Sequence, residues 1–163
     1  IETRINITDQ FSIQGSLGYT DAGFDEFLGF DADGVRGYDP VTDPAAAAAL
    51  KFERVPELTY NIMANYFQPL SNGAEIDFRL AYSYTDDFTN DALGTRAIIT
   101  DSYGLLDASV SYTFAGSGLK LTVFGKNITD EDYHDFALDN ALTSLTWGGV
   151  PDTYGLRLTY SFE

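Results

Sequence analysis

The chain has 163 residues, of which 44% are hydrophobic and 15% aromatic, and its net charge is −16. This acidity argues against a nucleic-acid-binding protein, because neutralising phosphates requires clustered Lys and Arg. No stretch approaches roughly 18 consecutive apolar residues, which excludes a transmembrane helix, whereas a transmembrane β-strand needs only about ten alternating residues.

Seven segments alternate between an apolar or aromatic face and a polar face, which predicts seven β-strands. The last segment is the clearest, because large apolar side chains from Tyr154 to Phe162 are separated by Gly, Arg, Thr and Ser. In chain order, the apolar faces are Ile1, Ile5 and Ile7; Phe11, Ile13, Leu17 and Tyr19; Leu58, Tyr60, Ile62, Ala64 and Tyr66; Ile76, Phe78, Leu80, Tyr82 and Tyr84; Leu106, Ala108, Val110, Tyr112 and Phe114; Leu119, Leu121 and Val123; and Tyr154, Leu156, Leu158, Tyr160 and Phe162. No charged residue lies on these faces.

The connections between the segments are alternately short and long. Residues 8–10, 68–74 and 115–118 form short joints of turn-forming residues, whereas the joints at about 20–57, 86–100 and 129–152 are long. A soluble β-sandwich also alternates, but it has no reason to sort its loops in this way. Outer-membrane barrels do sort them, and they are rich in Tyr and Gly as this chain is. The sequence therefore predicts an all-β, antiparallel transmembrane barrel, with a short helix over residues 45–52.

The acidic residues are concentrated in and beside the long joints. These regions hold nineteen of the 25 acids but four of the nine basic residues. The polar strand faces carry nine charged residues, which would be costly to desolvate in a narrow barrel filled with side chains and therefore indicate a wide lumen. Because bacterial single-chain barrels have an even number of strands, seven strands are expected to be a fragment, with upstream residues missing.

Neighbouring residues on each strand should meet opposite surroundings, because one face of a barrel wall contacts lipid and the other lines the lumen. We expect the apolar set to face outward: Leu80, Val110, Leu121 and Leu158. We expect the charged set to face inward: Arg79, Asp107, Lys120 and Arg157.

The tail carries the most specific pattern. Residues 121–133 (LTVFGKNITDEDY) and 147–162 (WGGVPDTYGLRLTYSF) resemble the end of TonB-dependent receptors. Residues 11–22 (FSIQGSLGYTDA) and 56–60 (PELTY) are similar to preceding strands of the same family. The positions that match the family's motif are Asn127, Asp130, Tyr133, Pro151, Tyr154 and Phe162.

The resemblance covers residues 1–163 and implies the C-terminal portion of a barrel of about 22 strands, without its plug domain. Members of this family lie in the bacterial outer membrane, in contact with its lipid. Upstream strands close the barrel, and a plug domain fills it and carries the segment on which a TonB-type energising complex acts. An extracellular small-molecule ligand binds between loops and plug. The resemblance therefore implies energised uptake of a scarce nutrient such as a ferric siderophore, cobalamin or an oligosaccharide, without a cofactor.

Four residues of the last long joint are candidates for ligand contact: Tyr133, His134, Phe136 and Trp147. The three aromatic residues can stack on a ligand, whereas the alternative places Tyr133 and Trp147 in the aromatic belt at the membrane interface. His134 is the single histidine, so a metal site lacks further imidazole or thiolate ligands. An esterase-like site would need a Ser nucleophile paired with a base. We therefore expect no metal site, no catalytic residue and no enzymatic activity.

Other functions are open at this point. A passive porin, or a small structural outer-membrane barrel completed by one more strand, has the same strand pattern. A porin would be expected to have no plug upstream. A barrel enzyme is a third class, which the missing Ser–His pairing disfavours.

Overall fold

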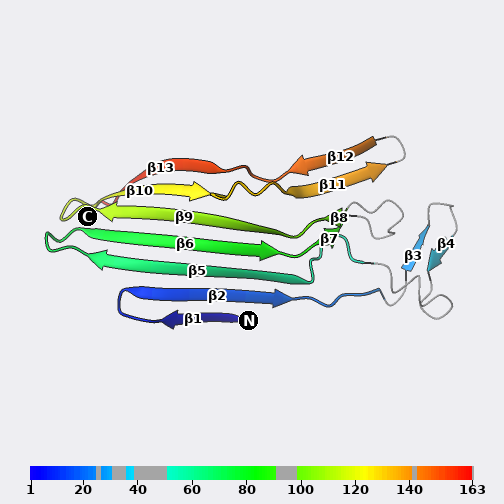
Figure 1. Cartoon of the computed structure of the whole chain (residues 1–163), viewed down its shortest axis with the longest axis horizontal. Coiled ribbons are helices and arrows are strands. Elements are labelled where there is room, and N and C mark those ends of the chain that lie inside the picture. Colours follow the sequence, from blue (N-terminus) through cyan, green and yellow to red (C-terminus); the bar gives the residue numbers. More distant parts are fainter. Residues whose placement is uncertain (25–26, 31–35, 39–50, 91–98, 141–142, 163) are drawn as a thin grey trace.

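The computed structural model describes residues 1–24, 27–30, 36–38, 51–90, 99–140 and 143–162. Its main feature is one antiparallel sheet of seven strands in the order β1-β2-β5-β6-β9-β10-β13 (Figure 1). The strands are β1 (Glu2–Asn6), β2 (Phe11–Tyr19), β5 (Leu58–Pro69), β6 (Glu75–Thr85), β9 (Tyr103–Thr113), β10 (Leu119–Lys126) and β13 (Thr153–Tyr160). The prediction of seven antiparallel strands is confirmed.

The three short turns lie at one end of this sheet and the long connections lie at the other, as Figure 1 shows. The turn between β5 and β6 illustrates why the turns are tight. Gly73 has a φ of 81°, which residues with a Cβ rarely adopt, and its N–H donates to the Leu70 carbonyl at 3.0 Å. The Asn72 side chain accepts a hydrogen bond from the Ala74 N–H at 3.0 Å. We refer to the two ends as the turn end and the loop end.

The long connections contain three further two-stranded sheets. These are β3 (Phe27–Phe30) with β4 (Arg36–Tyr38), β7 (Phe88–Thr89) with β8 (Ile99–Thr100), and β11 (His134–Asn140) with β12 (Thr143–Gly148). Within the long joint 129–152, β11 and β12 form a hairpin that the alternation pattern did not predict. Its register shifts between His134 and Phe136, which breaks the period-two pattern that reveals longer strands. The predicted helix falls mainly on residues 39–50, outside the described part of the chain.

The seven-stranded sheet is a single layer without a hydrophobic core. Among the described residues, the buried hydrophobic side chains are Ala74, Phe88 and Ala137, none of which belongs to the seven strands. Large apolar side chains on the strands are exposed instead, and Leu158 retains 68% of its accessible surface. A sandwich would cover this face with a second sheet, so the soluble alternative does not describe the fold.

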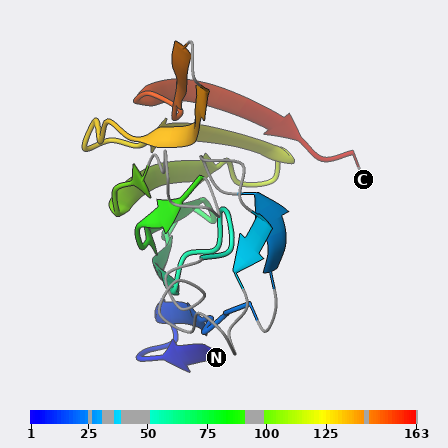
Figure 2. The ribbon, with the colours of Figure 1, turned by 90° about the vertical axis from the view of Figure 1, so that its right-hand side faces the viewer.

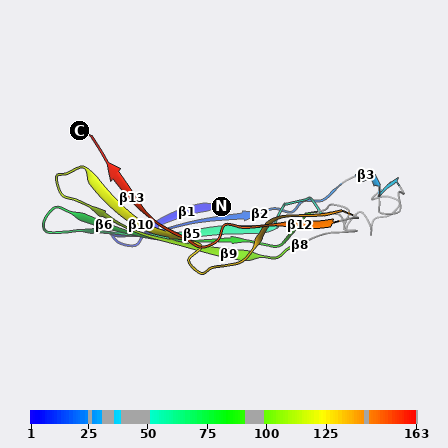
Figure 3. The ribbon, with the colours of Figure 1, turned by 90° about the horizontal axis from the view of Figure 1, so that it is seen from above.

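The sheet is curved, and its two faces differ in chemistry. Figure 3 shows β1 and β13, the two edge strands, displaced to the same side of the middle strands, and Figure 2 shows the strands in succession from the N-terminal to the C-terminal edge. Cross-strand register places Leu121 opposite Leu158 on one face and Thr122 opposite Arg157 on the other. A hollow of about 860 Å³ receives side chains from all seven strands, which marks its face as the concave one.

The predicted orientation of the strands is confirmed by this arrangement. Arg79, Lys120 and Arg157 line the hollow. Asp107 lines an adjoining space of about 290 Å³ together with Arg79 and Arg157. The register places the apolar set Leu80, Val110, Leu121 and Leu158 on the opposite, convex face.

Candidate functional site

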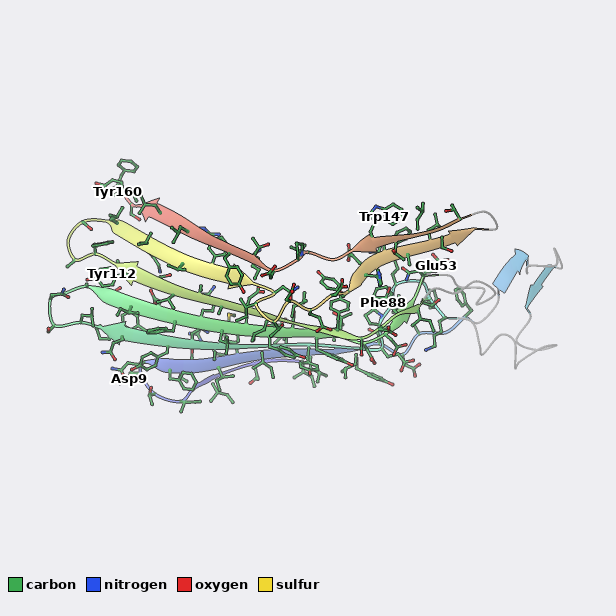
Figure 4. The ribbon with its side chains drawn as sticks, turned by 45° about the horizontal axis from the view of Figure 1, so that its top comes forward. Asp9, Glu53, Phe88, Tyr112, Trp147 and Tyr160 are labelled. Atoms are coloured by element: carbon green, nitrogen blue, oxygen red, sulfur yellow. The ribbon has the colours of Figure 1, made fainter. Side chains whose placement is uncertain are left out.

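The convex face carries two belts of aromatic side chains separated by aliphatic ones. The residues of the turn-end belt are Phe11, Tyr66, Phe78, Tyr112 and Tyr160, and those of the loop-end belt are Tyr19, Tyr60, Tyr82, Tyr84 and Tyr154. Tyr60 and Tyr84 stack with ring centroids 4.9 Å apart. Figure 4 shows Tyr112 and Tyr160 at the turn end. Paired aromatic belts around an aliphatic band are the pattern that outer-membrane barrels present to lipid.

The concave face is polar and charged. Lys120 Nζ donates to Asp77 Oδ2 at 3.0 Å, and the two side chains are 40% and 39% exposed. Arg79 Nε donates to Asn65 Oδ1 at 3.1 Å. The Arg157 guanidinium lies 5.4 Å from the centroid of the Phe124 ring. Water or a polar protein domain can solvate such a face, whereas lipid cannot.

Asn127 joins three segments at the loop end of the sheet. It is 3% exposed and has a φ of 48°, in the left-handed region that Asn adopts more readily than most residues. Its backbone N–H donates to Asp107 Oδ1 at 3.0 Å. Its Nδ2 donates to the carbonyls of Glu131 at 2.9 Å and Val150 at 3.2 Å, and its Oδ1 accepts from the Glu131 N–H at 2.9 Å. The side chain therefore fixes the chain before and after the β11–β12 hairpin to the sheet.

Tyr133 lies in the same junction. Its ring stacks on Tyr103, the first residue of β9, with centroids 4.2 Å apart. Its carbonyl accepts from the Gly149 N–H at 2.7 Å, and its hydroxyl accepts from the Val150 N–H at 3.2 Å. A Cβ added at Gly149 would collide with the Tyr133 ring. These contacts assign Tyr133 to the packing at the base of the hairpin.

Three long connections meet beyond this junction. The Arg54 N–H, on a residue with a φ of 58°, donates to the Thr89 carbonyl in β7 at 2.9 Å. The Arg54 guanidinium lies 5.5 Å from the centroid of the Phe136 ring in β11. The Phe136 ring in turn lies 5.1 Å from the Trp147 ring in β12. Figure 4 shows Trp147, Phe88 and Glu53 at the loop end of the structure. Segments from all three connections thus form one loop-end cluster.

The four candidate residues therefore do not all lie together. Phe136 and Trp147 are brought together in the loop-end cluster, and Trp147 is 50% exposed. His134 is exposed at the start of β11. Tyr133 lies apart from them, in the junction with Asn127.

The motif positions also separate by location. The Asp130 N–H donates to the Asn127 carbonyl at 2.9 Å, and the Pro151 carbonyl accepts from the Thr153 hydroxyl at 3.1 Å. The Tyr154 ring covers Gly125 so closely that no Cβ fits there. The Phe162 ring packs edge-on against the Tyr160 ring at the turn end, with ring centroids 4.7 Å apart.

Two residues of this region were missed by sequence reasoning, for different reasons. Arg54 lies in a long acidic joint, where nothing in the pattern distinguishes it from a solvated charge. Tyr103 stands just before the expected apolar face of β9. Its alternation with Leu105 would have placed it on the polar face, where an aromatic ring is unusual enough to be a signal.

The described residues offer no site for a metal and no helical span. They contain no group of three or more His, Cys, Asp and Glu side chains that could hold a metal ion. No helix in the described part of the chain has the length and apolar character needed to cross a membrane.

The sheet is curved, its convex face is apolar with two aromatic belts, its concave face is polar, and its long loops lie at one end. These features define a section of the wall of a wide outer-membrane-type barrel. The sequence agrees with this class. The model of the family described as TonB-dependent receptor-like β-barrel matches residues 1–128, and the chain belongs to that family. The family's proteins are outer-membrane receptors of Gram-negative bacteria.

Solved structures agree on the fold over the whole chain. The ferric yersiniabactin uptake receptor FyuA from Yersinia pestis matches 99% of this chain with a TM-score of 0.76 at 16% sequence identity. The chain spans 22% of the length of FyuA. Because it covers 99% of the chain, this match extends beyond residues 1–128, the part that the family model covers. No curated protein matches the chain significantly.

Proposed function

We propose that the chain forms the C-terminal part of the barrel of an outer-membrane receptor that takes up a scarce nutrient in an energised, TonB-coupled way. The observation that carries this proposal is the concave wall. All seven strands contribute to one hollow of about 860 Å³, and its lining includes Arg, Lys and Asp side chains. A charged wall of this kind requires a lumen filled with water or with a polar domain, as in a wide, plugged barrel.

The partners follow from the faces and edges of the sheet. Lipid of the bacterial outer membrane covers the belted convex face. Upstream strands of the same protein pair with the free edges of β1 and β13 and complete a barrel of about 22 strands. A plug domain occupies the lumen, and a TonB-type complex acts on the receptor through that plug.

The extracellular ligand binds at the loop-end cluster and the plug beneath it. Phe136 and Trp147 supply aromatic faces within that cluster, and His134, at the start of β11, supplies an exposed imidazole. Tyr133 positions their hairpin. The ligand classes proposed are a ferric siderophore, cobalamin and an oligosaccharide. FyuA is a ferric yersiniabactin uptake receptor, so a ferric siderophore is the first class to test.

Uptake measurements on the full-length parent test this function. The parent is expressed in a Gram-negative host that lacks competing receptors, with its energising complex present or deleted. Labelled ferric siderophores, cobalamin and oligosaccharides are supplied in turn. We expect one class to be taken up, and we expect deletion of the complex to abolish uptake while surface binding persists. Uptake that continues without the complex and rises linearly with ligand concentration would instead show a passive porin.

A matched pair of variants tests whether the ligand contacts the β11–β12 hairpin. Trp147→Ala should weaken binding of the transported ligand by about tenfold, in the range of a lost aromatic stacking contact. Thr146→Ala, on the neighbouring residue of β12 whose side chain lies on the other face of the hairpin, should leave binding unchanged. Equal effects of both substitutions would show that the hairpin has only a structural role.

A further inference from the structure

Three arginines on the concave face have no carboxylate partner among the described residues. Arg4 of β1, Arg79 of β6 and Arg157 of β13 all line the same hollow. The two ion pairs in the described part of the chain, Lys120–Asp77 at 3.0 Å and Lys51–Glu57 at 3.8 Å, both use lysine. In this hollow the lysine is therefore paired and the guanidiniums are not.

Two of these arginines are oriented without being neutralised. Arg79 uses one N–H to bond the Asn65 amide oxygen at 3.1 Å, and Arg157 lies over the Phe124 ring at 5.4 Å. A guanidinium has five N–H donors, so most remain available. A cation enclosed in a protein-filled lumen must be paired or hydrated, because its desolvation is costly.

The carboxylates that line this hollow do not balance its four basic side chains. Asp107, in the adjoining space, already accepts a hydrogen bond from the Asn127 N–H. The charged side chains lining the hollow are Arg4, Arg79, Lys120 and Arg157 against Asp9 and Asp77. Asp77 is already bonded to Lys120. The hollow is therefore positive, although the whole chain has a net charge of −16. A guanidinium presents a planar fork of donors that fits a carboxylate in two-point contact, which an ammonium group does not.

We propose that Arg4, Arg79 and Arg157 are a docking surface for carboxylate side chains on the plug domain, in the turn-end half of the lumen. This inference rests on the proposed function, which places a plug there. The spacing favours a folded surface over a small anion. Neighbouring strands lie about 4.8 Å apart, so Arg4 on β1 and Arg157 on β13, at opposite edges of the sheet, are separated by roughly 29 Å along the sheet. One phosphate or carboxylate ion cannot contact all three arginines.

The full-length receptor with its plug provides the test. The variant Arg79→Gln/Arg157→Gln removes two cations and keeps polar side chains that a lumen tolerates. The double variant Lys120→Gln/Asp77→Asn is the matched control, because it removes a pair that is satisfied within the wall. Hydrogen–deuterium exchange of the plug is measured at low and high NaCl, and heat-resistant electrophoretic migration checks that the barrel is folded.

The arginine variant should speed exchange on the plug by about tenfold or more, as expected for loss of a desolvated charge pair, and the control by less than about twofold. High NaCl should speed exchange in the wild type and have little further effect in the arginine variant. Arg79→Lys/Arg157→Lys should give an intermediate rate, because charge is kept and the fork is lost.

Unchanged plug exchange in a folded arginine variant overturns the inference. Protection of the wild type by inorganic phosphate, with no change in plug exchange on substitution, overturns it in favour of a free-anion site. These results differ from a failure of the proposed function. If the parent has no plug, or shows no energised uptake, the proposed function is wrong. If the receptor is active and the arginine variants leave plug exchange unchanged, only the proposed docking surface is wrong.

Discussion

The ring of Tyr133 stacks on the ring of Tyr103, with centroids 4.2 Å apart and planes inclined by 21°. Tyr103 begins β9 in the sheet, and Tyr133 immediately precedes the β11–β12 hairpin. Gly149, just after the hairpin, packs against the same Tyr133 ring. The hairpin that carries Phe136 and Trp147 is therefore clamped at its base against the seven-stranded sheet, and the Tyr103–Tyr133 pair fixes where the hairpin begins.

Gly149→Ala should release this clamp. The added Cβ collides with the Tyr133 ring, so either the ring leaves Tyr103 or the backbone after the hairpin moves. Overpacking of this kind costs about 1–3 kcal/mol. In the full-length parent we expect faster proteolysis within residues 134–148 and weaker ligand binding. Gly148→Ala is the control, because a Cβ there meets no atom within 4 Å. Equal behaviour of the two variants would contradict the clamp.

Asn127→Ala should open the same junction from its other side. The substitution removes two donated and one accepted hydrogen bond from a residue that is 3% exposed, and it places Ala at a φ of 48°. Together these changes should cost about 2–4 kcal/mol of local stability. Hydrogen exchange at Glu131 and Val150 in the full-length parent measures it.

A comparison with Asn127→Gly separates the two causes. Glycine tolerates the left-handed backbone but lacks the amide, so it should be destabilising by less than alanine. If the glycine and alanine variants both leave exchange at Glu131 unchanged, the amide does not hold this junction.

The sequence predicts the wall of the barrel well because long strands in lipid obey a simple rule. From Ile76 to Tyr84 every second side chain must be apolar to meet lipid, and the pattern is therefore visible without any neighbour. Gly73 and Asn72 mark the turn for an equally local reason. The prediction of strand faces needed nothing beyond this alternation.

The loop-end cluster was less accessible to the same reasoning. The Arg54–Phe136 contact joins residues from two different connections, and no periodicity in either segment indicates it. The β11–β12 hairpin is short, and its register shift after His134 interrupts the alternation. Tyr133 was singled out as a motif position and as a candidate for ligand contact, whereas its packing against Tyr103 and Gly149 is visible only in the structure.

Leu158→Arg should destabilise the barrel because it places a cation on the lipid face. Leu158 lies opposite Leu121 on the convex side and is 68% exposed in the sheet. An Arg near the middle of the bilayer costs about 2–4 kcal/mol. Thr159→Arg is the control, since residue 159 faces the concave side beside Lys120. Folding of the full-length parent into lipid vesicles, followed by heat-resistant migration, should fall for the first variant only. A comparable loss for Thr159→Arg would argue against the assigned faces.

The last prediction is that the 163-residue polypeptide cannot form a stable membrane barrel when it is produced by itself. Among the strands that the structure describes, β1 pairs only with β2 and β13 pairs only with β10. Each edge therefore leaves backbone N–H and C=O groups unpaired, and hydrocarbon cannot satisfy them, at a cost of several kcal/mol per group. In water the alternative is no better, because exposed apolar faces and open edges promote association. We expect aggregation or failure to insert, measured by size-exclusion chromatography in detergent and by vesicle flotation. A monomeric, heat-resistant species formed from these residues alone would contradict the larger barrel and support a small structural barrel, because only closure of the sheet on itself could satisfy both edges.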